Sequence, residues 1–280
     1  MNNTNTFSDY NLFETQTKKE WAAKLKNQSP LSRYRHANYD PIYFKEETLN
    51  TNTFEKSPTW DIVAEINIVD EKSANKEALQ ILKMGANSIS FLNFQKHNLE
   101  LILKDIKIDI ININFKKHEN SQTIIKQLQK IAEKRKIDLN QLKGVFYNEY
   151  IPHEEYQEYI RILPNYRFLA TSITRFRKNK KKQYNNIDIK HILFKYEPSN
   201  LFLLEIAKLR ALRIDFEREF KKHPYIECEV CILDTEFNPL ITSCVASLAS
   251  IIGGCNALKS SSNQSNEAHI KQQLILKHES

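Results

Sequence analysis

Apolar and polar positions alternate along residues 60–280 in a rhythm of short strands and longer helices. Residues 199–222 give the clearest helix, because apolar side chains recur there at steps of three and four residues. Ser199 and Asn200 are expected to cap its first turn, and additional leucines predict that most of its circumference is covered. A strand at 225–233 follows. This order is typical of a helix that packs outside a parallel sheet.

The same rhythm predicts eight strands and seven helices. The expected strands are residues 60–68, 88–92, 107–115, 143–148, 166–173, 190–196, 225–233 and 255–259. The expected helices are residues 71–84, 96–104, 120–136, 153–161, 199–222, 239–251 and 265–278. Residues 174–189 lack apolar periodicity, so a loop is expected where a fifth helix is due. Eight alternating units predict an α/β fold, a closed (β/α)8 TIM-type barrel with an N-terminal extension; an open doubly wound sheet is the alternative.

The domain boundary is expected near residue 55, where the regular pattern begins. Residues 1–55 are polar and contain one amphipathic segment at 17–28, which predicts an extension or arm. The arm either packs on its own domain or reaches onto a partner subunit. Residues 56–280 form the expected barrel.

Composition narrows the classes of ligand and location. The 280 residues carry 41 Lys+Arg against 34 Asp+Glu, a net charge of +7 that permits anionic ligands without selecting one. Four glycines are too few for a phosphate-cradling loop or a dinucleotide fingerprint. No apolar run reaches the roughly 18 residues of a membrane helix, and the first residues lack the pattern of a signal peptide. A cytoplasmic protein that does not enter membranes is therefore expected.

Candidate chemistry is sought at the carboxyl ends of the strands, where barrel enzymes place their active sites. These ends offer Asn93, Lys116, Lys117, His118, Asn148, Glu149, His153, Arg175, Arg177, Glu197, Asp234 and Glu236. Glu149 and His153 could act as a base and its neighbour, with Asp234 in the same pocket. The alternative is that Glu149 and His153 belong to an ordinary helix start with an acidic first turn.

Two further patterns are weighed for binding. Cys228 and Cys231 resemble half a zinc site, but residues three apart on a strand point to opposite faces, so no metal site is expected and the cysteines are interpreted as buried apolar residues. The basic segment 175–182 could contact nucleic acid, a CoA phosphate or an acidic partner, or form a solvated loop. Nucleic acid is not favoured, because no nucleic-acid motif accompanies the segment.

Three stretches resemble a known family. LEIAKLRALR (204–213), SIIGG (250–254) and WDIVAEINIVDEKSANKEALQILKMGANSISF (60–91) are similar to the barrel domain of methylmalonyl-CoA mutases, above all to their small, non-catalytic subunit. The resemblance implies an isomerase family in which CoA threads the barrel axis. It also implies adenosylcobalamin on a separate domain that carries Asp-x-His-x-x-Gly, a motif absent from this sequence.

The resemblance assigns no catalytic residue to this chain. The region that matches the family's substrate-facing histidine, residues 231–240, contains neither histidine nor glutamine. We therefore expect a non-catalytic small subunit in a heterodimer with a mutase large subunit that binds adenosylcobalamin, with an acyl-CoA as an open alternative ligand. Two other hypotheses remain: a stand-alone barrel enzyme that uses Glu149, His153 and Asp234, or an anionic-polymer binder that uses 175–182.

Overall fold

The computed structural model describes residues 59–118, 120–184, 186–230, 239–260, 270–274 and 277. All of them belong to one compact unit that begins at residue 56. The expected arm at 1–55 lies outside the described residues, and the division into arm and barrel therefore stays a prediction.

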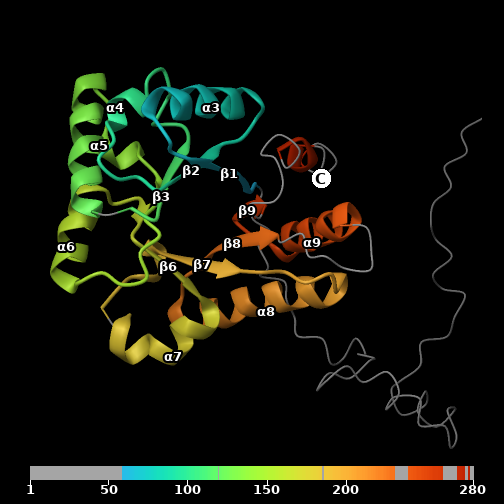
Figure 1. The fold of residues 1–280 in the computed structure, drawn as a ribbon. Coiled ribbons are helices and arrows are strands. Elements are labelled where there is room, and N and C mark those ends of the chain that lie inside the picture. Colours follow the sequence, from blue (N-terminus) through green and yellow to red (C-terminus); the bar gives the residue numbers. More distant parts are fainter. Residues whose placement is uncertain are drawn as a thin grey trace, which may run out of the picture. The chain divides into compact units, whose positions relative to one another are not determined.

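Parallel strands alternate with helices along the described chain (Figure 1). The strands are β1 (Asp61–Asn67), β2 (Ser88–Leu92), β3 (Asn112–Lys116), β4 (Gly144–Val145), β5 (Tyr166–Arg167), β6 (Leu169–Ser172), β7 (Ile192–Tyr196), β8 (Tyr225–Val230) and β9 (Ala257–Ser260). The helices are α3 (Glu71–Lys83), α4 (Leu99–Ile102), α5 (Ser121–Arg135), α6 (His153–Ile162), α7 (Ile173–Gln183), α8 (Phe202–Phe220) and α9 (Pro239–Gly253). Residues 270–274 and 277 are also helical.

The strands close into a ring. Seven of them pair in the order β3-β2-β1-β9-β8-β7-β6, and every pair is parallel. β4 and β5 pair with each other, and β5 continues into β6 after Phe168. Parallel bridges from Asn112 to Lys143 and from Phe115 to Phe146 join β3 to the β4 segment. The expected (β/α)8 barrel is confirmed, and the open doubly wound sheet is wrong.

The main hydrophobic core lies between the strands and the surrounding helices. Ile62, Ala64 and Ile66 occupy alternate positions of β1 and belong to this core. Outward-facing phenylalanines of neighbouring strands stack around the ring, with centroids 5.2 Å apart for Phe115 and Phe146. Because the outward positions supply this core, the intervening positions of each strand point into the barrel.

The turns around α3 show how the local sequence builds one β/α unit. The side chain of Asp70 caps α3 by accepting hydrogen bonds from the backbone N–H groups of Lys72 and Ser73, at 3.0 and 2.9 Å. Gly85 follows the helix with a φ of +108°, a conformation that a side chain would strain. The helix expected at 71–84 is therefore confirmed to within one residue.

The loop expected at 174–189 is wrong in its first part, because α7 spans Ile173–Gln183. Phe176 is the buried anchor of α7, with its ring centroid 5.1 Å from that of Phe194 and 5.9 Å from that of Phe216. Arginine and lysine have high helix propensity, which favours a helix in this basic segment. The packing of the buried Phe176 against Phe194 and Phe216 then stabilises that helix.

α8 differs from its expected environment. The side chains that it buries are those of Glu205, Leu209, Arg213 and Phe216, whereas Leu203 remains 77% exposed. The expected coverage of most of its circumference is therefore wrong. The expected cap is also wrong, because the helix begins after Leu201 without a side-chain cap. None of the helices that the structure describes is long and apolar enough to cross a membrane.

Candidate functional site

Charged side chains fill the interior of the barrel toward the carboxyl ends of the strands. We call the following group the axial cluster: Glu65 of β1, Lys116 of β3, Tyr147 after β4, Lys195 of β7, Glu227 and Glu229 of β8, and Lys259 of β9. Barrel interiors are ordinarily packed with valine, isoleucine and leucine. Burial of charges costs several kcal/mol for each ion unless partners compensate, so a charged interior is unfavourable for stability alone.

Lys259 is the centre of the axial cluster. Its side chain is 1% exposed, and its Nζ lies 2.8 Å from Glu65 Oε1 and 3.1 Å from Glu229 Oε1. The Nζ of Lys116 lies 3.0 Å from the same Oε1 of Glu65. Two lysine side chains therefore share one carboxylate oxygen, and the ion pairs connect β9 to β1 and β8, and β3 to β1.

A second pair lies beside this group. The Oη of Tyr147 donates a hydrogen bond of 2.5 Å to Glu227 Oε2. The Nζ atoms of Lys116 and Lys195 lie 5.9 and 5.5 Å from the centroid of the Tyr147 ring, within the range of a cation–π contact. Tyr147 therefore connects the carboxyl group of Glu227 to two amines.

The environment shifts two of these groups toward neutrality. Burial, with repulsion from Glu229, raises the pKa of Glu227, although Lys259 and the Tyr147 hydroxyl act against this shift. Burial and then repulsion from Lys259 lower the pKa of Lys116, although Glu65 acts against it. A carboxyl group that retains its proton and an amine that releases its proton more readily are a matched acid and base.

The other ion pair keeps its charges. Burial opposes ionisation of Glu65, but Lys259 and Lys116 outweigh it and hold the pKa of Glu65 below its ordinary value. Burial likewise opposes ionisation of Lys259, but Glu65 and Glu227 raise the pKa of Lys259 above its ordinary range. Lys259 and Glu65 therefore form a fixed ion pair beside the matched acid and base.

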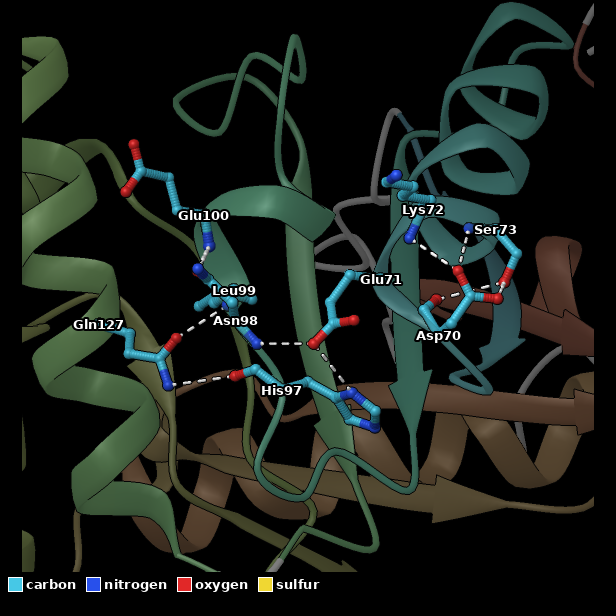
Figure 2. Close-up of polar contacts among 9 residues, drawn as sticks. All are labelled: Asp70, Glu71, Lys72, Ser73, His97, Asn98, Leu99, Glu100 and Gln127. Carbon is cyan, nitrogen blue, oxygen red and sulfur yellow. Dashed lines mark hydrogen bonds and ion pairs between the residues drawn. The ribbon is translucent and has the colours of Figure 1, made fainter.

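At the carboxyl end of the barrel, hydrogen bonds connect the segments that begin α3 and α4 to each other and to α5 (Figure 2). Glu71 Oε1 accepts a hydrogen bond of 3.2 Å from the backbone N–H of Asn98 and lies 3.3 Å from His97 Nδ1. Gln127 of α5 accepts a hydrogen bond of 2.8 Å from the backbone N–H of Leu99. These contacts fix the starts of α3 and α4 against α5, which supports the strands that carry Glu65 and Lys116.

The structure does not bring the predicted catalytic residues together. Glu149 is exposed and pairs with Arg175 at 2.7 Å. His153 is the exposed first residue of α6, and its ring lies near that of Tyr156. Asp234 lies outside the described residues. The interpretation of Glu149 and His153 as part of a helix start therefore fits their positions better than a shared pocket.

Most of the other residues singled out from the sequence make structural contacts, and one of them belongs to the axial cluster. Arg177 of the basic segment 175–182 forms an ion pair with Asp215 of α8. Among the cysteines, Cys228 and Cys255 are buried as expected, whereas Cys244 is exposed, against expectation. Of the strand-end candidates, Lys116 alone belongs to the axial cluster.

The other members of the axial cluster were missed, although a signal exists. Asp61, Glu65 and Asn67 lie on the same face of β1 as Val63, and the other face of β1 is apolar; Glu227 and Glu229 likewise share one face of β8. In a strand covered by helices on one side, polar residues with a period of two indicate a polar barrel interior.

Comparisons with known proteins gave matches among solved structures. No protein-family model matches the sequence, and no curated protein matches it. Similar solved structures include a dihydropteroate synthase from Yersinia pestis, at 10% identity and a TM-score of 0.43, with 79% of this chain and 92% of that chain covered. The dihydropteroate synthase from Stenotrophomonas maltophilia is 10% identical with a TM-score of 0.38, with 78% and 92% covered. Plasmodium falciparum HPPK-DHPS is 11% identical with a TM-score of 0.45, with 79% and 47% covered. At this identity the likeness concerns the fold and assigns no activity to this chain.

These findings correct the expected family. The similar structures named above are dihydropteroate synthases, so the kinship with the methylmalonyl-CoA mutase small subunit is wrong. The expected isomerase family and the expected heterodimer with a mutase large subunit are wrong with it. The interior also differs physically, because the axial cluster fills the barrel where CoA was expected to thread. That a partner subunit binds adenosylcobalamin stays a prediction, which these findings do not test.

Proposed function

We propose that this chain is a stand-alone (β/α)8-barrel enzyme that transfers protons to and from a small carbonyl compound at the carboxyl end of the barrel. The observation that carries the proposal is the pairing of an amine of lowered pKa, Lys116, with a carboxyl group of raised pKa, Glu227, around one tyrosine. Acidic and basic groups whose pKa values are shifted in opposite directions and that converge at the end of a barrel are typical of acid–base catalysis.

The proposed step is an enolisation. In its deprotonated form, which the lowered pKa makes more accessible, the amine of Lys116 takes a proton from the carbon next to the substrate carbonyl and becomes an ammonium group. The protonated carboxyl group of Glu227 gives its proton to the carbonyl oxygen and becomes a carboxylate, so that an enol forms and no charge is created on the substrate. Tyr147 orients Glu227 through their hydrogen bond, and Lys259 favours the carboxylate that forms.

A titration of Lys116 tests the proposal without knowledge of the substrate. After reductive methylation with 13C-labelled formaldehyde, each lysine gives an NMR signal that moves as its amine titrates. The signal lost in Lys116→Met is expected to titrate below the ordinary range of a lysine amine, because burial and Lys259 disfavour its charge. Titration of Lys116 together with the exposed lysines would remove the proposed base.

Hydrogen exchange tests the reaction itself. Small ketones with a carboxylate or phosphate group, incubated with the protein in D2O, are expected to take up deuterium next to the carbonyl. Lys116→Met and Glu227→Gln are each expected to slow this exchange by about 100-fold, the lower end of the range for general acid–base catalysis. Lys104→Met, at an exposed position, is the matched control and should retain the wild-type rate. Equal rates in all four proteins would contradict the assignment.

A cytoplasmic location is part of the same proposal. It is supported by Cys228 and Cys255, which are buried next to each other as free thiols that hydrogen-bond rather than as a disulfide.

A further inference from the structure

The opposite end of the barrel contains a polar cavity, at the amino ends of the strands. Its volume is about 430 Å³, which is within the range of small-molecule sites. Asp61, Asn112 and Arg167 line it from β1, β3 and β5, and Tyr225 lines it from β8. Because the axial cluster lies toward the carboxyl ends of the same strands, the proposed catalytic chemistry does not use this cavity.

The carboxylate of Asp61, which lines this cavity, already accepts hydrogen bonds from three side chains. Asp61 Oδ1 accepts a hydrogen bond of 3.0 Å from Asn87 Nδ2. Its Oδ2 accepts hydrogen bonds of 2.7 Å from Asn112 Nδ2 and of 2.6 Å from Tyr225 Oη. Three side-chain donors therefore occupy the oxygens of Asp61, and Arg167 is not one of them.

Arg167 has a buried donor, its Nε, that no acceptor satisfies. Its guanidinium lies 3.5 Å from the centroid of the Tyr225 ring, which fixes the plane of the group. Its Nε is buried with no hydrogen-bond acceptor, and in the described ranges no carboxylate lies within ion-pair distance of it. By contrast, the buried Arg213 donates hydrogen bonds of 2.7 Å to Gly254 O and to Asn256 Oδ1. A guanidinium has five N–H donors and costs stability when it is desolvated without acceptors.

We infer that this cavity is a binding site for a small molecule with a carboxylate or phosphate group, which Arg167 holds by charge-assisted hydrogen bonds. Lys143 lines the same cavity and supplies a second positive charge at its exposed edge. A planar guanidinium stacked on an aromatic ring can present paired N–H groups to an oxyanion, which is the geometry that favours carboxylates and phosphates. The site is separate from the axial cluster and does not depend on the proposed enzymatic activity.

Thermal unfolding of the full chain tests the inference with two probes, inorganic phosphate and succinate. Chloride keeps the ionic strength constant, because phosphate also stabilises proteins without binding a site. At about 100 times the Kd, we expect a saturable rise in Tm of about 5 °C for at least one of the two anions. A response to phosphate alone or to succinate alone identifies the group that the natural ligand carries.

Variants decide whether Arg167 causes the rise. Arg167→Gln should abolish it, and Lys143→Gln, at an exposed position, should weaken the apparent affinity several-fold. Arg161→Gln, which removes an exposed arginine of α6, is the matched control and should respond as the wild type does. The inference is overturned if neither anion gives a saturable rise, or if Lys143→Gln and Arg167→Gln respond as Arg161→Gln does.

Discussion

Lys259→Met is expected to lower the free energy of unfolding by about 3 to 5 kcal/mol at pH 7.5, measured by urea denaturation. The substitution keeps an unbranched side chain of similar length and removes the ammonium group from the barrel interior. Glu65 and Glu229 then lose a cation at 2.8 and 3.1 Å. Because breaking a buried ion pair leaves an uncompensated charge, the loss exceeds that expected from packing alone.

The size of this loss should depend on pH in a defined direction. In the wild type, Lys259 and Lys116 outweigh burial and hold the folded-state pKa of Glu65 below its ordinary value of 4.5. The stability contributed by Glu65 is therefore present above pH 4.5 and is lost as the pH falls through the folded-state pKa. Without Lys259, burial is the largest remaining influence and acts to raise that pKa, so the destabilisation grows as the pH rises above 4.5. The difference between variant and wild type should therefore shrink from pH 7.5 toward pH 4.5.

Two further variants separate charge from packing. Lys104→Met makes the same chemical change at an exposed position and is expected to alter stability by no more than about 0.5 kcal/mol. The double substitution Lys259→Met with Glu65→Gln removes one of the carboxylates that Lys259→Met leaves without this cation. It should recover part of the lost free energy of unfolding, and its stability should depend less on pH. A Lys259→Met protein as stable as the wild type at pH 7.5 would show that the ion pairs of the axial cluster do not stabilise the barrel.

The sequence predicts the architecture because each unit repeats the same physical pattern. Asp70 caps α3, Gly85 ends the turn after it, and Ile62, Ala64 and Ile66 place alternate apolar side chains of β1 toward the helices. Such signals are local, so a single chain reveals them. The helix α7 was not predicted because its buried anchor Phe176 has meaning only when Phe194 and Phe216 are placed beside it.

The site is harder to predict because it exists only after the ring closes. Lys116 was a candidate because it ends a strand, whereas Glu65 and Lys259 lie inside strands far apart in the sequence. Only parallel pairing of β1 with β9 brings those two together. The mutase kinship was wrong for a related reason. The stretch at 60–91 contains the cap and the turn of a β/α unit, and these specify geometry that many barrels share rather than their chemistry.

Gly144→Ala is expected to destabilise the barrel by at least about 3 kcal/mol, again measured by urea denaturation. A Cβ at this position would lie 1.8 Å from the backbone oxygen of Ile113 and 2.7 Å from Tyr166 Cε1. The clash with Ile113 involves backbone, so no rotation of a side chain relieves it. β3 and the β4 segment would have to separate where isolated bridges, rather than a continuous ladder, join them. Because this is the junction that closes the ring, the strain should affect the whole barrel.

Gly253→Ala is the matched control, since its Cβ would also be crowded but against a side chain. The nearest atoms are Cδ1 and Cβ of Leu209, at 2.7 and 2.8 Å. Leu209 can shift with α8, and alanine at the end of α9 regains up to about 1 kcal/mol of helix propensity, so a smaller loss than that of Gly144→Ala is expected. If Gly144→Ala unfolds at the same urea concentration as the wild type, the close approach of β3 and β4 is not required for closure of the ring. A loss confined to Gly144→Ala, with Gly253→Ala near the wild type, would identify that approach as the tighter of these two steric constraints.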